Sequence, residues 1–178
     1  MTDKHIYKDA PTYCHYFFDL VETNDLLVEL YKSKIQTEEL FQLITPETEN
    51  FSYAIGKWTT KEVLKHIIDC ERVYIYRALR FSRFDNTELS GFDENKYIDD
   101  LKSAFYNLTD LKEEYVAVRT ASIALFKSMT DEMLDFKGKA NNALFTARTL
   151  GFMTVGHNMH HCDILKSKYL KGQHENFL

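Results

Sequence analysis

Hydrophobic residues recur at helical spacing along four long stretches of this chain, with polar residues between them. The first stretch runs from Thr23 to Ile44, where apolar side chains return every three or four residues, as on one face of a helix. Thr23 or Asn24 can cap its start, and Pro46 follows its end because proline cannot continue a helix. The apolar positions of this predicted helix are Leu26, Leu27, Leu30, Ile35, Leu40, Phe41 and Ile44.

The second stretch has the clearest start signal. Thr59 is followed three residues later by Glu62, which is the pattern of a capping box. The helical pattern then continues to about Phe84. Asp85 to Tyr97 is predicted to be a loop because it contains the turn-forming residues Asn86, Ser90 and Gly91.

Two further helices are predicted in the second half of the chain. The third covers Thr109 to Met129 and is followed by a short turn at Thr130 and a loop from Gly138 to Asn142. The fourth runs from Thr146 to about Leu170, with Gly172 as its C-cap. One side of the third helix is lined by Leu111, Tyr115, Val118, Ser122, Leu125 and Phe126.

Four long helices indicate an all-α fold, an antiparallel four-helix bundle forming one domain over residues 1–178. The scarcity of Pro (2) and Gly (6) argues against a many-turned β fold, and 44% hydrophobic residues exclude disorder. Residues 1–22 form a short N-terminal arm. Its aromatic side chains could pack on their own bundle or across a homodimer, and these are Tyr13, Tyr16, Phe17 and Phe18.

Charge and cysteine content exclude several classes of protein. A net charge of −5 argues against nucleic-acid binding, which needs a basic face. No apolar run approaches the ~18 residues of a membrane span, and the polar N-terminus lacks a signal-peptide core. Three cysteines without a CxxC pair indicate free thiols in a reducing environment. We therefore expect a cytoplasmic protein.

Histidines provide the candidate chemistry. The segment GHNMHH places His157 and His161 four residues apart, so both imidazoles project from one helix face. At about 100° per residue they share the apolar face of Leu150 and Ile164. His66 lies on the apolar face of the second helix, and a bundle could bring it to the pair to complete a three-nitrogen metal site with open positions.

The spacing alone leaves a second interpretation open. A single histidine on an apolar face is commonly a hydrogen-bonded core residue, and His-x-x-x-His is a moderate signal. However, two core-facing imidazoles repel each other when protonated and need partners when neutral, and a metal ion removes both difficulties.

Residues near these histidines have more than one interpretation each. Cys70 could be a fourth ligand or a small apolar residue. His160 could donate a hydrogen bond that supports the site, contact a substrate, or lie at the solvent edge. Asp69 and Glu71 could orient a ligand histidine or form ion pairs with Arg72, Arg77 or Arg80. Arg80, Arg83 and Arg148 could bind an anionic substrate, although Arg80 and Arg83 also suit the dipole at a helix C-terminus. Packing explains Trp58, Tyr74 and Tyr76 better than a substrate cage does.

Three segments of the chain resemble the DinB-like (damage-inducible B) superfamily. They are YAIGKWTTKEVLKHIIDCERVYIYRALRFSRFDNTELSGFDENKY, VRTASIALFKSM and ARTLGFMTVGHNMHHCDILKSKYL, in the family's order, within Asn24 to Leu170. The resemblance implies a four-helix bundle that holds a divalent metal, often nickel or zinc, on three histidines. Residue by residue, the implied ligands are His66, His157 and His161.

The resemblance also implies two classes of function. Relatives include metal-dependent hydrolases, thiol S-transferases and thiol-dependent isomerases, which suggests an enzyme acting on a small molecule, with a low-molecular-weight thiol as one candidate. The sequence identifies no catalytic side chain, although an Asp or Glu between Asp85 and Tyr97 could be the general base. The alternative is a dimeric stress-response protein that binds a metal or ligand without turnover. An open pocket at the histidines would favour the enzyme, and a sealed site the alternative.

Overall fold

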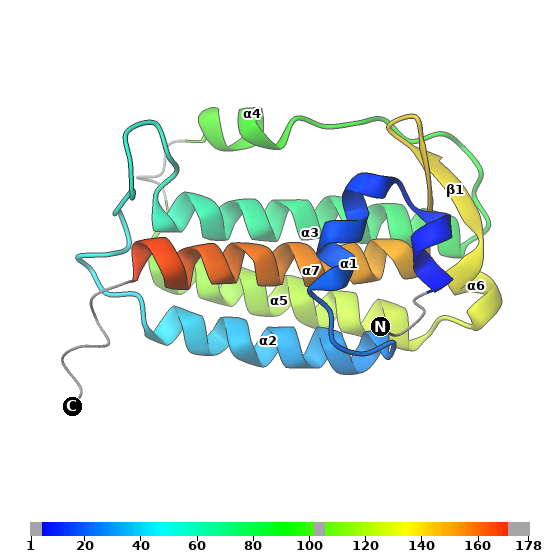
Figure 1. Ribbon diagram of the computed structural model, residues 1–178, viewed down its shortest axis with the longest axis horizontal. Helices are drawn as coiled ribbons and strands as arrows, with labels where there is room; N and C mark the ends of the chain where they lie inside the picture. Colours follow the sequence, from blue (N-terminus) through cyan, green and yellow to red (C-terminus); the bar gives the residue numbers. More distant parts are fainter. Residues whose placement is uncertain (1–4, 102–105, 171–178) are drawn as a thin grey trace.

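The computed structural model describes residues 5–101 and 106–170 (Figure 1). Four long helices form a bundle, which confirms the predicted all-α fold: α2 (Leu26–Gln42), α3 (Thr60–Ser82), α5 (Leu108–Lys127) and α7 (Ala147–Ile164). A π-helical turn, η4 (Leu165–Tyr169), extends α7. The predicted C-cap, Gly172, lies outside the described residues.

The helices are not all antiparallel to their neighbours. α3 and α2 each pack against both α5 and α7. Lys65 and Glu71 of α3 pair in that order with Glu114 and Arg119 of α5, so α3 and α5 run parallel. The predicted antiparallel arrangement is therefore wrong for this pair, because the chain after α3 runs back along the bundle to α4 (Glu94–Asp99), so that α5 begins at the same end as α3 (Figure 1).

Local capping explains where the long helices begin. The predicted capping box of α3 is confirmed, since Glu62 N donates to Thr59 Oγ1 (3.3 Å) and Thr59 N donates to Glu62 Oε2 (2.7 Å). Helix α7 begins after Thr146, as expected. Helix α2 is capped by Asp25 instead of Thr23 or Asn24.

Two apolar clusters fill the bundle, and α7 is buried on nearly every side. Ile35, predicted to be apolar core, is 56% exposed, because the covered face of α2 is the one turned to α5 and α7. Val155 and Cys162 turn away from the face that carries His157, yet they are only 0% and 4% exposed. The reason is that α7 packs against α2 and the N-terminal arm as well as α3.

The N-terminal arm packs on its own bundle. It consists of η1 (His5–Asp9), η2 (Thr12–Cys14) and α1 (His15–Asp19), and α1 lies across α7 (Figure 1). Gly156 allows this close approach, because a Cβ there would lie 2.1 Å from the Phe17 carbonyl oxygen. The arm is therefore held directly beside His157.

Several short elements occupy stretches that were predicted to be loops. The predicted loop from Gly138 to Asn142 is wrong. β1 (Lys137–Ala140) pairs there with β2 (Ala143–Thr146), and the two residues between the strands, Asn141 and Asn142, have positive φ. Such a pair forms a two-residue hairpin turn. α4 (Glu94–Asp99) begins within the predicted 85–97 loop, capped by Asp93, and α6 (Asp131–Asp135) follows α5. Among the described helices, none is long and apolar enough to cross a membrane.

Candidate metal centre

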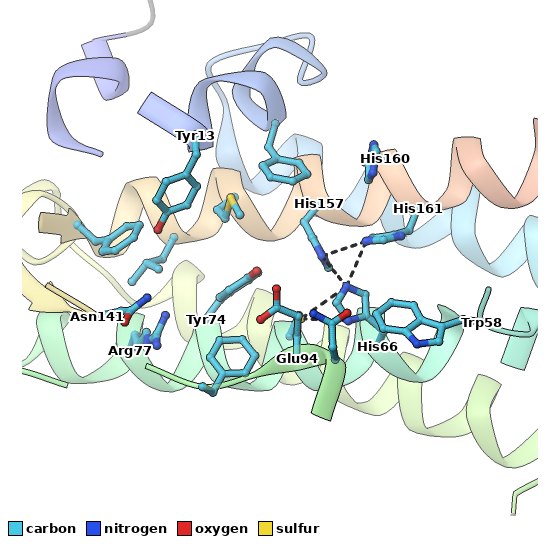
Figure 2. A pocket seen from close by; sticks show the side chains of 17 residues that line it. Tyr13, Trp58, His66, Tyr74, Arg77, Glu94, Asn141, His157, His160 and His161 are labelled. Carbon is cyan, nitrogen blue, oxygen red and sulfur yellow. Dashed lines mark hydrogen bonds between the residues drawn. The ribbon is translucent and has the colours of Figure 1, made fainter. Parts of the chain in front are cut away.

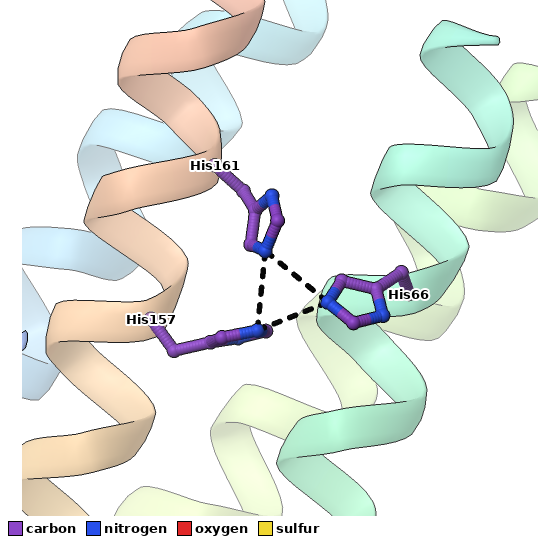
Figure 3. Close-up of side chains that lie close together, drawn as sticks. All are labelled: His66, His157 and His161. Carbon is purple, nitrogen blue, oxygen red and sulfur yellow. Dashed lines mark hydrogen bonds between the residues drawn. The ribbon is translucent and has the colours of Figure 1, made fainter. Parts of the chain in front are cut away.

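The structure brings the three predicted histidines together between α3 and α7 (Figure 3). His66 Nε2 lies 3.0 Å from His157 Nε2 and 3.1 Å from His161 Nε2. The remaining side of the triangle, between the two α7 nitrogens, is 3.2 Å. Because α3 and α7 are antiparallel neighbours, the beginning of one helix meets the end of the other, and these are the positions that carry the histidines.

Hydrogen bonding alone cannot satisfy this triangle. Each neutral Nε2 either carries a hydrogen or presents a lone pair. Among three such nitrogens at least two must therefore be alike, so at least one of the three contacts is repulsive. Three lone pairs directed at one cation would remove the conflict, and among the described residues these three form a group able to hold a metal ion.

Burial keeps the cluster neutral. Burial, with a smaller contribution from neighbouring histidines, lowers the pKa of His66 to about 4 and that of His161 to about 3. The pKa of His157 also falls well below its ordinary value, first through burial and then through the other imidazoles. Neutral imidazole is the form that binds metals, so the protein holds these side chains ready as ligands near pH 7.

The cluster lies at one end of a cavity of about 440 Å³ (Figure 2). Trp58 packs against the His66 ring at 4.8 Å, and Tyr74 meets the His157 ring edge-on at 5.7 Å. The other wall comes from the arm, the hairpin and α4. The lining residues outside the histidine cluster include Tyr13, Phe17, Cys70, Arg77, Phe92, Glu94, Asn141 and Phe145.

Cys70 and His160 border the histidine cluster without belonging to it. Cys70 Sγ lies 3.6 Å from His66 Nδ1 and 3.8 Å from His66 Nε2, so it flanks the His66 ring, but it is not a member of the three-histidine group. Burial raises the pKa of this thiol to about 12, so it stays protonated. His160 is half-buried at the cavity wall, where its Nδ1 lies 3.0 Å from the Tyr16 hydroxyl.

The acidic residues of α3 pair elsewhere. Asp69 contacts Lys65 at 3.1 Å and Arg72 at 3.8 Å, in line with the ion-pair interpretation. Glu71 pairs with Arg119, so the expectation that its partner is Arg72, Arg77 or Arg80 is wrong. Arg119 lies within the apolar stripe of α5, and a charged residue in that stripe was the signal from which a buried ion pair could have been predicted.

The arginines considered as substrate contacts also have other roles. Arg80 pairs with Asp85, and Arg148 with Asp131 and Asp135. Arg83 is exposed and donates to the Ser82 hydroxyl. The arginine that does line the cavity is Arg77, which follows His66 by 11 residues and therefore lies on the same helix face.

Comparisons with known proteins agree with the fold. The family model of the DinB superfamily matches residues 29–165. A solved structure described as "YfiT from Bacillus subtilis is a probable metal-dependent hydrolase with an unusual four-helix bundle topology" superposes with a TM-score of 0.73 and 17% identity, over 84% of this chain and 86% of that one. A DinB-like protein, YjoA, also from Bacillus subtilis, superposes with a TM-score of 0.61 and 17% identity, over 84% and 92%. No curated protein matches significantly.

The match of the family model spans most of the chain and contains all three histidines of the cluster. It also contains α3, α4, the hairpin and α7, which line most of the cavity, whereas Tyr13 and Phe17 of the arm precede the matched range. This chain therefore belongs to the DinB superfamily.

Proposed function

We propose that this protein is a metal-dependent enzyme that uses His66, His157 and His161 to hold a divalent transition metal. The observation that carries the proposal is the convergence of three neutral imidazoles at the end of an accessible cavity. The bundle shared with YfiT, which is described as a probable metal-dependent hydrolase, supports it.

The spacing of the nitrogens fits a metal. Ligand nitrogens about 2.0–2.1 Å from an ion and roughly 90–110° apart are separated by about 2.8–3.4 Å. The three observed separations are 3.0, 3.1 and 3.2 Å. Nickel and zinc both suit imidazole ligands, and three protein ligands leave positions open for water or substrate.

A divalent metal held in this way acts as a Lewis acid and lowers the pKa of a coordinated water or thiol. The chain itself must then accept a proton and exclude bulk water. Glu94 is the acid of the predicted 85–97 loop for which we propose the first task, since its carboxylate reaches into the cavity beside Tyr74 and the histidines (Figure 2). Trp58, Phe17 and Tyr74 form the apolar part of the wall beside the histidines.

Two reactions suit such a site. One is hydrolysis of a small molecule, and the other is S-transfer from a low-molecular-weight thiol. The alternative, metal binding without turnover in a dimeric stress-response protein, is less well supported, because the histidines open onto a cavity with polar side chains converging on it.

Metal analysis of protein purified without an affinity tag tests the site. We expect about one equivalent of nickel or zinc in the wild type and less than about a tenth in His157→Ala, because two remaining imidazoles bind divalent ions weakly. His160→Ala is the matched control, since His160 belongs to the same motif but lies outside the cluster. Equal metal content in all three proteins contradicts the site.

Turnover is tested separately with ester and thiol-transfer substrate panels, each with and without chelator. Activity that is lost on chelation and restored by metal supports an enzyme, and the responsive panel distinguishes hydrolase from S-transferase. Metal bound at the site with no activity in any panel supports the alternative.

A further inference from the structure

Arg77 is a buried cation without a carboxylate partner. It is 6% exposed, its Nη2 donates to the Ser90 carbonyl oxygen (2.9 Å), and its guanidinium lies 5.3 Å from the centre of the Phe92 ring. No carboxylate in the described ranges 5–101 and 106–170 is within ion-pair distance of it, although Arg72, Arg80, Arg119 and Arg148 all have such partners.

The electrostatics of this position are unfavourable as they stand. Burial removes water from the guanidinium and lowers the pKa of Arg77. At Arg119, burial acts in the same direction, but the Glu71 carboxylate outweighs it and raises the pKa. A buried charge is ordinarily paired with an opposite charge, and Arg77 has no such anion beside it.

The position of Arg77 relates it to the three histidines. Eleven residues correspond to three helical turns plus about 20°, so Arg77 and His66 lie on one face of α3, about 16 Å apart along the axis. Side chains on a helix lean toward its N-terminus, which turns Arg77 toward the histidines. Both side chains line the same cavity (Figure 2). Between them the lining is largely apolar, with Tyr74, Phe92, Phe145, Leu150 and Met153, and its polar members include Glu94 and Asn141.

We propose that the cavity takes an elongated small molecule with an anionic oxygen group bound by Arg77 and an apolar body along the aromatic wall. Carboxylate, phosphate and sulfonate share the chemistry that a guanidinium recognises through paired N–H donors. If the proposed metal site holds, the opposite end of this molecule meets the three histidines, so Arg77 is a specificity-determining residue placed away from the reaction.

A purely structural role makes a different prediction. Arg77 attaches the loop before α4 through Ser90, and that loop in turn pairs with β1 through Leu89 and Lys139. If this attachment were its whole purpose, replacing Arg77 would lower stability and leave ligand preference unchanged.

The test uses full-length, chelator-treated protein and isothermal calorimetry with matched probes: phenylbutanoate, its neutral amide, phenylpropyl sulfonate and phenylpropyl phosphate. We expect the wild type to bind at least one of the anions about tenfold to hundredfold more tightly than the amide. Arg77→Met should abolish this preference, and Arg77→Lys should retain a weaker one because an ammonium lacks the planar fork. Arg80→Met, one turn further along α3 and outside the cavity, is the matched control and should behave as the wild type.

Three results overturn the proposal: equal binding of anion and amide by the wild type, a preference that survives Arg77→Met, or no binding of any anion up to about 10 mM. If Arg77→Met does not fold, Arg77→Lys decides, because an unchanged preference there contradicts recognition by the guanidinium. Since the probes are measured without metal, failure of the metal site does not affect this result.

Discussion

Two buried polar clusters lie side by side in this bundle, and they differ in how well their members satisfy one another. In the first, Arg119 donates to both carboxylate oxygens of Glu71 at 2.8 Å, and Ser122 donates to the same carboxylate at 2.7 Å. The remaining Arg119 nitrogen donates to Ser33 Oγ and the Leu30 carbonyl. In the second, the three histidines have no mutually consistent hydrogen-bonding arrangement.

This difference distinguishes polar groups that stabilise the fold from polar groups that are available to a ligand. The Glu71 and Arg119 cluster is complete within the protein and joins α2, α3 and α5 in the middle of the core. The histidine cluster and Arg77 both line a cavity. Among the described residues, the three imidazoles lack a cation to share and Arg77 lacks a carboxylate. Buried polar groups that line a cavity and lack a partner of opposite charge or hydrogen-bonding character in their own chain are candidates for ligand contact.

The largest expected effect comes from breaking the complete cluster. Arg119→Met leaves the buried Glu71 carboxylate without its cation and should lower the free energy of unfolding by about 3–5 kcal/mol. The double variant Glu71→Met/Arg119→Met should recover much of that loss, because no isolated charge remains. Urea denaturation of the three proteins measures this. A loss below about 1 kcal/mol for Arg119→Met would show that the cluster is not a structural element.

Completing the second cluster should have the opposite effect. Adding nickel or zinc to chelated protein at about a hundredfold excess over its Kd should raise the free energy of unfolding by about 3 kcal/mol. The same addition should leave the stability of His161→Ala unchanged. Thermal melts of both proteins with and without metal measure the difference. Equal stabilisation of the variant would place the bound metal elsewhere.

An exposed cavity residue should affect rate without affecting stability. Glu94→Gln should reduce turnover of a responsive substrate about a hundredfold, equivalent to about 2.7 kcal/mol of activation free energy, because the amide cannot accept a proton. Metal content and melting temperature should stay the same. Glu88→Gln is the control, since Glu88 is an exposed acid of the same loop that pairs with Lys139. Equal activity of both variants would remove Glu94 from the reaction.

Acidification should distinguish the clusters in metal-free protein. Histidines titrate near 6.5 when unfolded, whereas burial holds the folded pKa of His66 at about 4 and of His161 at about 3. The unfolded state therefore binds more protons below pH 6.5, and stability falls by roughly 1–3 kcal/mol per pH unit as the pH drops toward 4. Urea titrations at several pH values measure the slope. His66→Leu/His161→Leu should flatten it, and an unchanged slope would assign it to other groups.

The smallest effect is expected at Cys70. Its sulfur can accept the hydrogen of His66 Nδ1 at 3.6 Å, which leaves the Nε2 lone pair free for a metal. Cys70→Ala should weaken metal affinity about tenfold and lower the free energy of unfolding by less than about 1 kcal/mol. Cys70→Ser keeps an acceptor and should be milder. Complete loss of metal in Cys70→Ala would instead identify the thiol as a ligand.

Local signals in the sequence predicted the helices well and the short elements poorly. The capping box at Thr59 and the apolar periodicity of α3 involve residues close in sequence, so they are visible without a fold. The hairpin escaped prediction because Asn141 and Asn142 resemble ordinary loop residues unless their positive φ is known. The buried Arg119 was missed because its stabilisation depends on Glu71, 48 residues away.

Helical spacing in the sequence alone determined that His157 and His161 share one face and that His66 belongs to a separate apolar face, since that spacing is set by the backbone. Tertiary structure decided the rest. The antiparallel register of α3 on α7 brings the three Nε2 atoms within 3.2 Å, and the same register places Arg77 at the far end of the cavity. Distances between helices depend on packing of the whole core, which no local pattern encodes.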